Sequence, residues 1–418
     1  MCSSDLNPHT KYRCRIGFGA SYHELHLDTI GFAELDTAQL GPSPGTYTYT
    51  DVTSQLTNIE IRRGRYRTTD RVQAGTCVLT FYDPSRNFDP ENTAGPYYGN
   101  LQPRRPVIVD AKTPSGSYQP LYTGWITGIG YRQEPGGYLT AEISCADNLA
   151  TLAIAQLTAD LAVSAESSGT RVTNVINAVA YPGSTNIATG DTTFVAGTIP
   201  AGTNALDYLT QCMGYEWGEL FDSHDGVLTF RNRSANLNPI TSVTFTPDTS
   251  GIQYTTIDVQ RGDEVYTIAQ ADDNTGATVT ATDLAAALNY GSNAITISGG
   301  LMNNGDCQTL TNYVLNLYDQ PTSNVRSIEV LVDVTVSNSE EIALFGTDIG
   351  DAVKVQRTFT VGSPLTITAY YAVEGITHVI NRATHTVTMR LGNQTTGGYM
   401  TLDNAAFGIL DTNLLAPG

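Results

Sequence analysis

The sequence predicts a mainly β fold with a small α+β insert, and three observations support this prediction. Short runs in which apolar and polar residues alternate outnumber runs with helical spacing, as is typical of half-buried strands. Thr, Gly, Tyr, Val and Ile are abundant, which favours strands and tight turns. A pattern of strands in the first third of the chain also returns in the last third. The 418 residues are enough for several domains with cores of their own.

An irregular segment, residues 1–45, is expected before the first β unit, which we assign to residues 46–150. Alternating apolar and polar residues predict strands in this unit at 46–61, 76–82 and 106–111. A hairpin with an EPGG turn at 134–137 completes it.

Five arginines lie in the stretch IRRGRYRTTDR, residues 61–71. If the preceding strand continues through this stretch, Arg63, Arg65 and Arg67 share one of its faces. A stripe of this kind could bind DNA, but arginines in an acidic protein more often pair with carboxylates. We therefore expect ion pairs within the chain or contacts with a neighbouring protein.

A long loop, residues 83–106, separates two of the predicted strands. Four oxygen-bearing residues alternate at its start: Asp83, Ser85, Asn87 and Asp89. The spacing is that of an EF-hand, but Phe88 stands where that motif needs Gly, and Ala94 where it needs Glu. The pattern therefore argues against a calcium site and favours a rigid surface loop.

The same loop is longer than the roughly 12 to 15 residues beyond which an unstructured connection is usually functional. Prolines stiffen it, and Tyr97 and Tyr98 supply large contact area with polar tips, a common chemistry at interfaces. We expect the loop to be an arm that contacts a neighbouring subunit.

Residues 151–245 predict the α+β insert. One helical face is expected at Val172, Val175, Ile176 and Val179, with Thr170 as the N-cap. A second helix follows in NALDYLTQCMGY, residues 204–215, and then a hairpin that turns at Asp225–Gly226.

The second β unit is assigned to residues 246–395 and is followed by a tail, residues 396–418. Its order of strands and turns repeats that of the first unit at a nearly constant offset, since residues 353–355 correspond to 107–109 and Gly375 to Gly124. Two similar β units within one chain are the simplest explanation. Three copies of such a chain would place six similar units around an axis.

Charge is uneven along the chain. Residues 1–150 hold 13 Lys and Arg against 15 Asp and Glu, a net charge of −2, so the remainder carries −17 of the total of −19. Such an acidic body is not expected to bind nucleic acid. The six cysteines are scattered and lack metal-ribbon spacing, which predicts reduced thiols in a protein folded in a cytoplasm. No secretory signal and no membrane-spanning stretch are recognised.

The motifs DVT, IEIRRGR, AGTCVLTFYDPSRNFDPEN, GPYYGNLQPRRPV and LYTGWI, in this order, resemble the minor tail proteins of long-tailed bacteriophages, especially those of actinobacteria. The stretches YYAVEGITHVI, TVTMRLG and MTLDNAAFGILDTNLLAPG resemble the ends of the same proteins. The similarity covers residues 46–147 and 345–415 well. The hairpin YEWGELFDSHDGVLTFRNR resembles the insert of tail-tip hub proteins, although the final hairpin, NRATHTVTMRL, lacks their usual tryptophan.

This resemblance implies a structural, non-enzymatic tail-tip or baseplate hub protein of the virion, with two tube-type β-barrel units. It implies a trimer that is assembled in the host cytoplasm, joins the tail tube to the tip and encloses the channel for DNA ejection. The implied partners are distal tail, tape-measure and other minor tail proteins. Genomic DNA passes without specific binding, and neither a cofactor nor a metal is implied.

Two groups of site residues follow as expectations. Subunit contacts are expected at Tyr97, Tyr98, Arg63, Arg65 and Arg67. An acidic channel would repel the DNA and keep it centred, over about 8 Å in physiological salt. The acids expected to line that channel are Asp333, Asp348, Asp351 and Glu374.

Two other functions stay open. The hairpin gathers acids and a histidine that could serve a cell-wall hydrolase with a pair of catalytic carboxylates: Glu216, Glu219, Asp222, His224 and Asp225. A receptor-binding adhesin would be similarly rich in strands and tyrosines. The internal repeat favours the hub, because an adhesin does not need the geometry of a tube.

Overall fold

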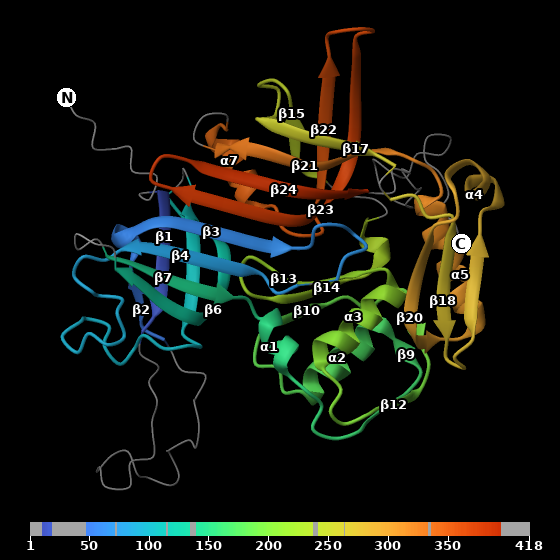
Figure 1. Cartoon of the computed structure of the whole chain (residues 1–418), viewed down its shortest axis with the longest axis horizontal. Coiled ribbons are helices and arrows are strands. Elements are labelled where there is room, and N and C mark those ends of the chain that lie inside the picture. The colour runs from blue at the N-terminus through green and yellow to red at the C-terminus, as the bar shows by residue number, and fades with distance from the viewer. Residues whose placement is uncertain are drawn as a thin grey trace. The chain divides into compact units, whose positions relative to one another are not determined.

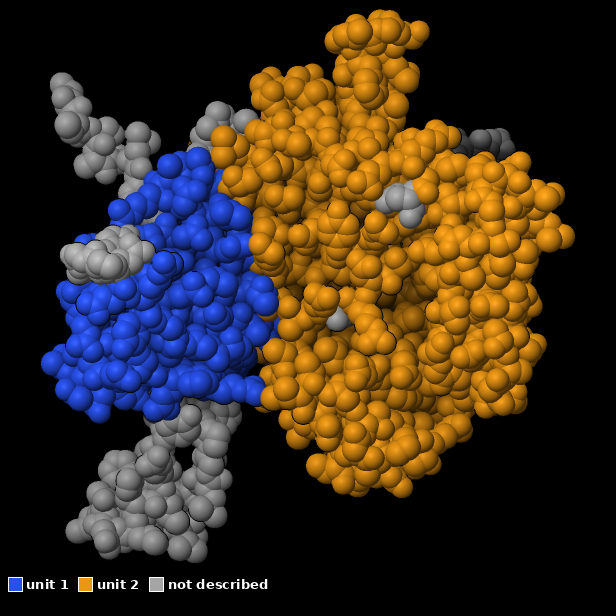
Figure 2. Space-filling view, viewed as in Figure 1, with its two compact units in different colours: residues 1–61, 76–147, 378–385 blue, residues 62–75, 148–377, 386–418 orange. Residues whose placement is uncertain are grey.

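The structure, a computed structural model, describes residues 11–18, 47–71, 73–113, 116–133, 139–236, 241–262, 264–332 and 336–393. Asp333, the tail at 396–418 and most of the segment 1–45 lie outside these residues. The chain forms two compact units, coloured separately in Figure 2. Unit 1 comprises residues 1–61, 76–147 and 378–385, and unit 2 comprises residues 62–75, 148–377 and 386–418.

Unit 1 is built around one β-sheet. Its strands are β1 Tyr12–Gly17, β2 Tyr49–Asp51, β3 Leu56–Gly64, β4 Thr76–Tyr82, β5 Pro106–Lys112, β6 Tyr118–Gln133 and β7 Leu139–Ala146. A short 3-10 helix, Thr53–Gln55, precedes β3. In β4, Cys77, Leu79 and Phe81 are buried and the residues between them are not, which is the predicted alternation.

Two expectations for this region are wrong. Residues 12–17 form β1 rather than an irregular segment, because β1 pairs with β5 and because Arg13 and Arg15 both bind the buried Asp110 carboxylate. The strand β3 ends at Gly64, whose φ of 83° lies in the left-handed region that favours glycine. Arg65 and Arg67 therefore follow the strand and share no strand face with Arg63.

A second set of strands lies mainly in unit 2. Its strands are β15 Thr241–Thr246, β16 Ile252–Gln253, β17 Thr256–Arg261, β21 Ser323–Leu331, β22 Ala352–Phe359, β23 Leu365–Asn381 and β24 His385–Asn393. The shortest of them is β16, with two residues. Helix α7, Asn338–Gly346, begins with a capping box formed by Ser337 and Glu340.

The order of neighbouring strands is the same in two sets of strands. It is β3-β4-β7-β6-β5-β1 in the first and β17-β21-β24-β23-β22-β15 in the second. Each contains a meander of three consecutive strands, β5-β6-β7 or β22-β23-β24. The last strand of each meander pairs with a strand that precedes the meander in the chain: β7 pairs with β4, and β24 pairs with β21. The outermost pairs differ, since β1 runs antiparallel to β5 whereas β15 runs parallel to β22. The fold is mainly β, as predicted, and the same strand order recurs in both sets of strands.

The rest of unit 2 is an α+β region. Its helices are α1 Leu149–Ile154, α2 Ser168–Ala178, α3 Ala205–Glu216, α4 Leu284–Tyr290 and α5 Asn304–Tyr318. Its strands are β8 Leu161–Val163, β9 Glu166–Ser167, β10 Thr185–Ile187, β11 Thr193–Phe194, β12 Gly197–Ile199, β13 Glu219–Asp222, β14 Leu228–Arg231, β18 Ile268–Asp273, β19 Thr278–Thr282 and β20 Ala294–Met302. Figure 1 shows the elements in chain order.

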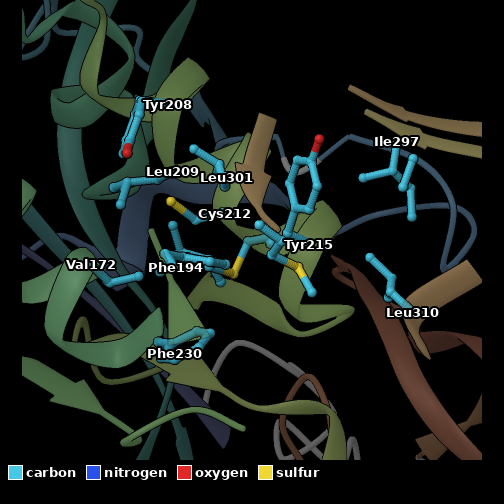
Figure 3. Packing of buried hydrophobic residues seen from close by; sticks show 14 of the residues in the cluster. Val172, Phe194, Tyr208, Leu209, Cys212, Tyr215, Phe230, Ile297, Leu301 and Leu310 are labelled. Carbon is cyan, nitrogen blue, oxygen red and sulfur yellow. The ribbon is translucent and has the colours of Figure 1, made fainter. Parts of the chain in front are cut away.

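This region shares one core that extends past the expected boundary at residue 245. Leu209 and Cys212 of α3 belong to the same buried cluster as Leu301 of β20 and Leu310 of α5 (Figure 3). The predicted helices and the turn at Asp225–Gly226 are present, but α2 is capped by the side chain of Ser167 rather than by Thr170.

Candidate functional site

Most of the predicted charged residues meet in one place within unit 2, which we call the ionic cluster. It consists of Arg63, Arg65, Glu219, Asp222, His224, Arg231, Asp348, Asp351 and Glu374. These residues come from the end of β3 and the segment after it, the β13–β14 hairpin, the turn at 348–351 and β23. All four residues of β13 are buried, so Glu219 and Asp222 do not lie on a solvated face.

One half of the ionic cluster is centred on Asp348. The buried Arg63 guanidinium forms an ion pair with this carboxylate and also donates to the Asp222 carbonyl oxygen at 3.4 Å. His224 approaches the same carboxylate with its backbone nitrogen at 2.9 Å and its Nδ1 at 3.0 Å. Burial alone would raise the pKa of Asp348, but Arg63 and His224 outweigh it and lower that pKa to about 2. Asp348 is therefore ionised at neutral pH.

The other half is centred on Arg65. Its Nε lies 2.5 Å from Glu374 Oε2, and its Nη2 lies 3.4 Å from Glu219 Oε1. Glu219, at the longer distance, is the weaker partner of this arginine. Thr68 also donates to Glu374 Oε1 at 2.7 Å. Burial and the nearby charge of Glu374 raise the pKa of Glu219 to about 7, against the opposing effects of Arg65 and Arg231.

Two residues that sequence reasoning missed complete the surroundings of Glu219 and Asp222. Asn148 donates its backbone N–H to Asp222 Oδ2 at 3.0 Å, yet burial still raises the pKa of Asp222 to about 6. Gly350 has a φ of 78°, and a Cβ there would lie 2.4 Å from Glu219 Oε2. The Gly in the sequence DIGD, between two cluster acids, was the available signal for this close approach.

The rim of the ionic cluster is half-exposed. Arg231 lies 3.4 Å from Asp351, whose other carboxylate oxygen accepts from the Asp348 N–H at 2.9 Å. Arg231 was missed by sequence reasoning, although it ends the alternating strand after the predicted turn. Exposed pairs of this kind contribute little to stability, so the buried pairs dominate the cluster.

Two hairpin residues that were grouped with Glu219 and Asp222 lie outside the ionic cluster. Glu216 is buried at the end of α3, where it accepts from Ser168 Oγ at 2.6 Å and Thr192 N at 3.0 Å. Its carboxylate therefore fixes a loop. Asp225 is exposed in the turn and accepts from the Ser223 hydroxyl. The five residues are thus not one catalytic constellation.

The predicted arm at 83–106 folds against its own unit. Phe88 is fully buried and stacks on Phe81 at 4.0 Å, while Tyr97 stacks on Phe18 at 4.3 Å. Tyr98, in contrast, is 50% exposed.

The first acid of this loop fixes the turn that follows it. Asp83 accepts from the backbone N–H groups of Asn87 and Phe88 at 2.7 and 2.8 Å. Across the described ranges, His, Cys, Asp and Glu side chains form no group that could hold a metal ion.

The chemistry available to the ionic cluster is electrostatic. Arg65 lies on the wall of a groove of about 560 Å³ between the segment 68–71, α3 and β20, whereas Glu219, Asp222 and Glu374 do not line it. A carboxyl with a pKa near 7 suits proton transfer, but a catalytic acid must reach its substrate. The cluster therefore resembles an internal clamp more than an open active site.

Comparisons with solved structures place this fold. The tail protein from Neisseria meningitidis MC58 aligns with a TM-score of 0.55 at 12% identity, over 91% of this chain and 95% of its own. The 43 kDa tail protein of prophage MuSo2 from Shewanella oneidensis aligns with a TM-score of 0.52 at 12% identity, over 82% of this chain and 95% of its own. The chain has the fold of phage tail proteins.

The match is one of fold, because the identities are low. No protein family model matches the chain, and no relative was found among curated proteins. In the part of the chain that the structure describes, none of the helices has the length and apolarity needed to cross a membrane. The resemblance to phage tail proteins, drawn from the ordered motifs between residues 51 and 126, is thus confirmed at the level of the fold.

Proposed function

We propose that this chain is a structural, non-enzymatic protein of a phage tail tip, which forms a ring of three copies around the DNA exit channel. The observation that carries the proposal is the repeated strand order in a chain with a tail-protein fold. Three copies with two similar β units each would give six units around one axis, which matches a three-fold tip to a six-fold tube. Distal tail, tape-measure and other minor tail proteins are the proposed partners.

The ionic cluster would hold the β13–β14 hairpin, the turn at 348–351 and the segment after β3 in fixed positions. Buried ion pairs add little net stability over an apolar core, but removing one partner is costly. Such a cluster therefore suits a part that must keep its shape during assembly. This role requires neither a substrate nor a cofactor.

The burial of the predicted site residues changes their assignment. Inside unit 2, Arg63 forms an ion pair with Asp348, and Arg65 forms one with Glu374. Tyr97 packs inside unit 1. We therefore retain Tyr98 and Arg67 as candidates for subunit contact. Of the four predicted channel acids, the half-exposed Asp351 is the one retained, since Asp333 lies outside the described residues.

Labelling of intact virions with antibody against the purified chain tests the proposal. We expect label at the distal end of the tail, and we expect tails that lack this protein to stop at an incomplete tip. Label along fibres at the side of the tail would instead support an adhesin and would contradict the hub.

A cell-wall hydrolase is the second candidate, and the raised pKa of Glu219 is the observation that favours it. Cell-wall zymography of the wild type and of Glu219→Gln separates the two functions. Clearing by the wild type that disappears in Glu219→Gln would establish the enzyme and overturn the structural proposal.

A further inference from the structure

A β-hairpin extends from unit 2 without cover. It is formed by the end of β22 and the start of β23, which pair from Gln356↔Thr368 to Phe359↔Leu365. The neighbouring strand β15 pairs with β22 only as far as Val355, so the hairpin leaves the sheet at that point. In Figure 1 it projects away from the rest of unit 2, and Figure 2 shows the same projection in space-filling form. We call residues 356–368 the hairpin arm.

The tip of the hairpin arm is apolar on its surface. Phe359 and Leu365 form its last pair and are exposed, and Val361 in the turn is 88% exposed. A two-stranded hairpin is marginally stable in water unless something covers it. The tip therefore has the properties of a surface that is buried in an assembly.

A second apolar surface lies on helix α4 of the same unit. Leu284 and Leu288 are four residues apart, share one helical face and are both exposed, the latter by 88%. Tyr290 is exposed beside them. We call these three residues the α4 patch. Figure 1 shows that the hairpin arm and the α4 patch lie at separate places on unit 2, so one copy cannot bring them together.

Charge indicates which partner these surfaces suit. The chain has a net charge of −19, yet no Lys, Arg, Asp or Glu occurs between Arg357 and Glu374, or between Asp283 and Asp306. Two copies of an acidic protein repel each other, and the repulsion is smallest where uncharged surfaces meet. A basic partner would instead select the acidic surfaces of this chain. The uncharged arm and patch therefore fit a second copy of the same chain.

We propose that the hairpin arm of one copy docks on the α4 patch of the next copy. The contact is heterologous, because it joins two different surfaces, and heterologous contacts close into a ring when the rotation between copies allows it. This inference rests on the proposed ring assembly and names the contact that would build it. Its apolar core would be Phe359, Val361 and Leu365 against Leu284 and Leu288.

A cross-linking experiment between two single variants tests the contact. Val361→Cys and Leu288→Cys are purified separately, mixed, and treated with a short thiol-reactive cross-linker. Five of the six native cysteines, at 14, 77, 145, 212 and 307, are buried. Cys2 lies outside the described residues and is replaced by serine in every sample, so the unmixed variants and the otherwise unchanged chain serve as background. We expect a covalent dimer in the mixture at several times the yield of either variant alone. An equal yield in all samples would contradict the docking.

Substitutions test the energetic role of the same contact. Val361→Lys and Leu288→Lys should each weaken self-association at least about tenfold, measured by analytical ultracentrifugation, because each removes a buried apolar side chain from the contact. Lysine makes the chain less acidic, so weaker association cannot arise from added repulsion. Ile154→Lys is the matched control, since Ile154 is 66% exposed on the same unit and lies outside both surfaces.

The two proposals fail in different ways. If the wild type assembles and neither lysine variant weakens assembly, the proposed docking contact is wrong, but the proposed ring assembly is not contradicted. The hairpin arm would then bind another tail protein. If the wild type remains a monomer at every concentration, the proposed ring is wrong, and the docking contact that depends on it is wrong as well. Circular dichroism of each variant verifies that the fold is intact.

Discussion

At the scale of single residues, the ionic cluster joins charges that are far apart in the sequence. Composition alone indicated that the arginines at 63–67 would pair with carboxylates, and Arg63 and Arg65 do. The partners could not be predicted, because Arg63 and Asp348 are separated by 285 residues and meet only in the folded unit. Because their arginine partners lie so far away in the sequence, Asp348 and Glu374 were predicted to line a channel, whereas their carboxylates are buried in the fold.

Glu219 gives the ionic cluster a pH dependence with a defined sign. Its pKa is about 7 in the folded chain and 4.5 in its ordinary state, so the folded chain binds more protons between these values. The contribution of Glu219 to stability is therefore complete below pH 4.5 and is lost as the pH rises through about 7. Asp222, with a pKa of about 6, acts in the same direction.

The variant Glu219→Gln should remove the part of this pH dependence that Glu219 contributes. We expect its free energy of unfolding to match the wild type near pH 4.5 and to exceed it by on the order of 2 kcal/mol at pH 8. Urea denaturation at both pH values measures the difference. Asp258→Asn, at an exposed position on β17, is the control for the loss of one carboxylate, and at pH 8 it should gain less stability over the wild type than Glu219→Gln does. A difference of the same size at both pH values would mean that Glu219 does not titrate in this range.

Removal of Arg63 should leave a buried charge without its partner. We expect Arg63→Met to lower the free energy of unfolding by about 3 to 5 kcal/mol, and Arg63→Met with Asp348→Asn to recover part of that loss. Thermal unfolding of the single and double variants measures both effects. Arg62→Met, on the exposed side of the same strand, should change stability by less than about 1 kcal/mol. A single variant as stable as Arg62→Met would show that the pair is not part of the fold.

At the scale of elements, strands with local alternation and turns with Gly were predictable, and β4 and the β13–β14 hairpin are examples. Elements that depend on distant partners were not. β1 becomes a strand because it pairs with β5, almost 100 residues later. The α+β insert extends to α5 because the apolar residues of α5 belong to the same buried core as those of α3, and no local pattern indicates this.

The loop at 83–106 combines both kinds of residue, and its two tyrosines should behave differently. Tyr97→Ala should lower the free energy of unfolding by about 2 to 4 kcal/mol, because it removes a ring that stacks on Phe18. Tyr98→Ala should leave stability within about 0.5 kcal/mol and instead weaken assembly, because its side chain is exposed.

Chemical denaturation and a sedimentation measurement on the two tyrosine variants separate these effects. The phenylalanine variants of the same positions, which keep the ring, serve as controls. If Tyr98→Ala assembles as the wild type does, the loop is a packed surface element without a role in subunit contact.

At the scale of the whole molecule, the repeat was visible in the sequence because turns and glycines recur at a nearly constant offset. The structure adds that six strands follow the same order in both sets of strands. Assembly cannot be predicted from such a repeat, because it depends on exposed surfaces such as the hairpin arm and the α4 patch. The exposure of these surfaces is known only from the fold.

Electron microscopy of the purified chain and of intact tail tips tests the central claim most directly. We predict class averages with three copies around an axis, in which six similar β units surround a central hole. Monomers under all conditions, or copies attached at the side of the tail with no hole on the axis, would contradict this account.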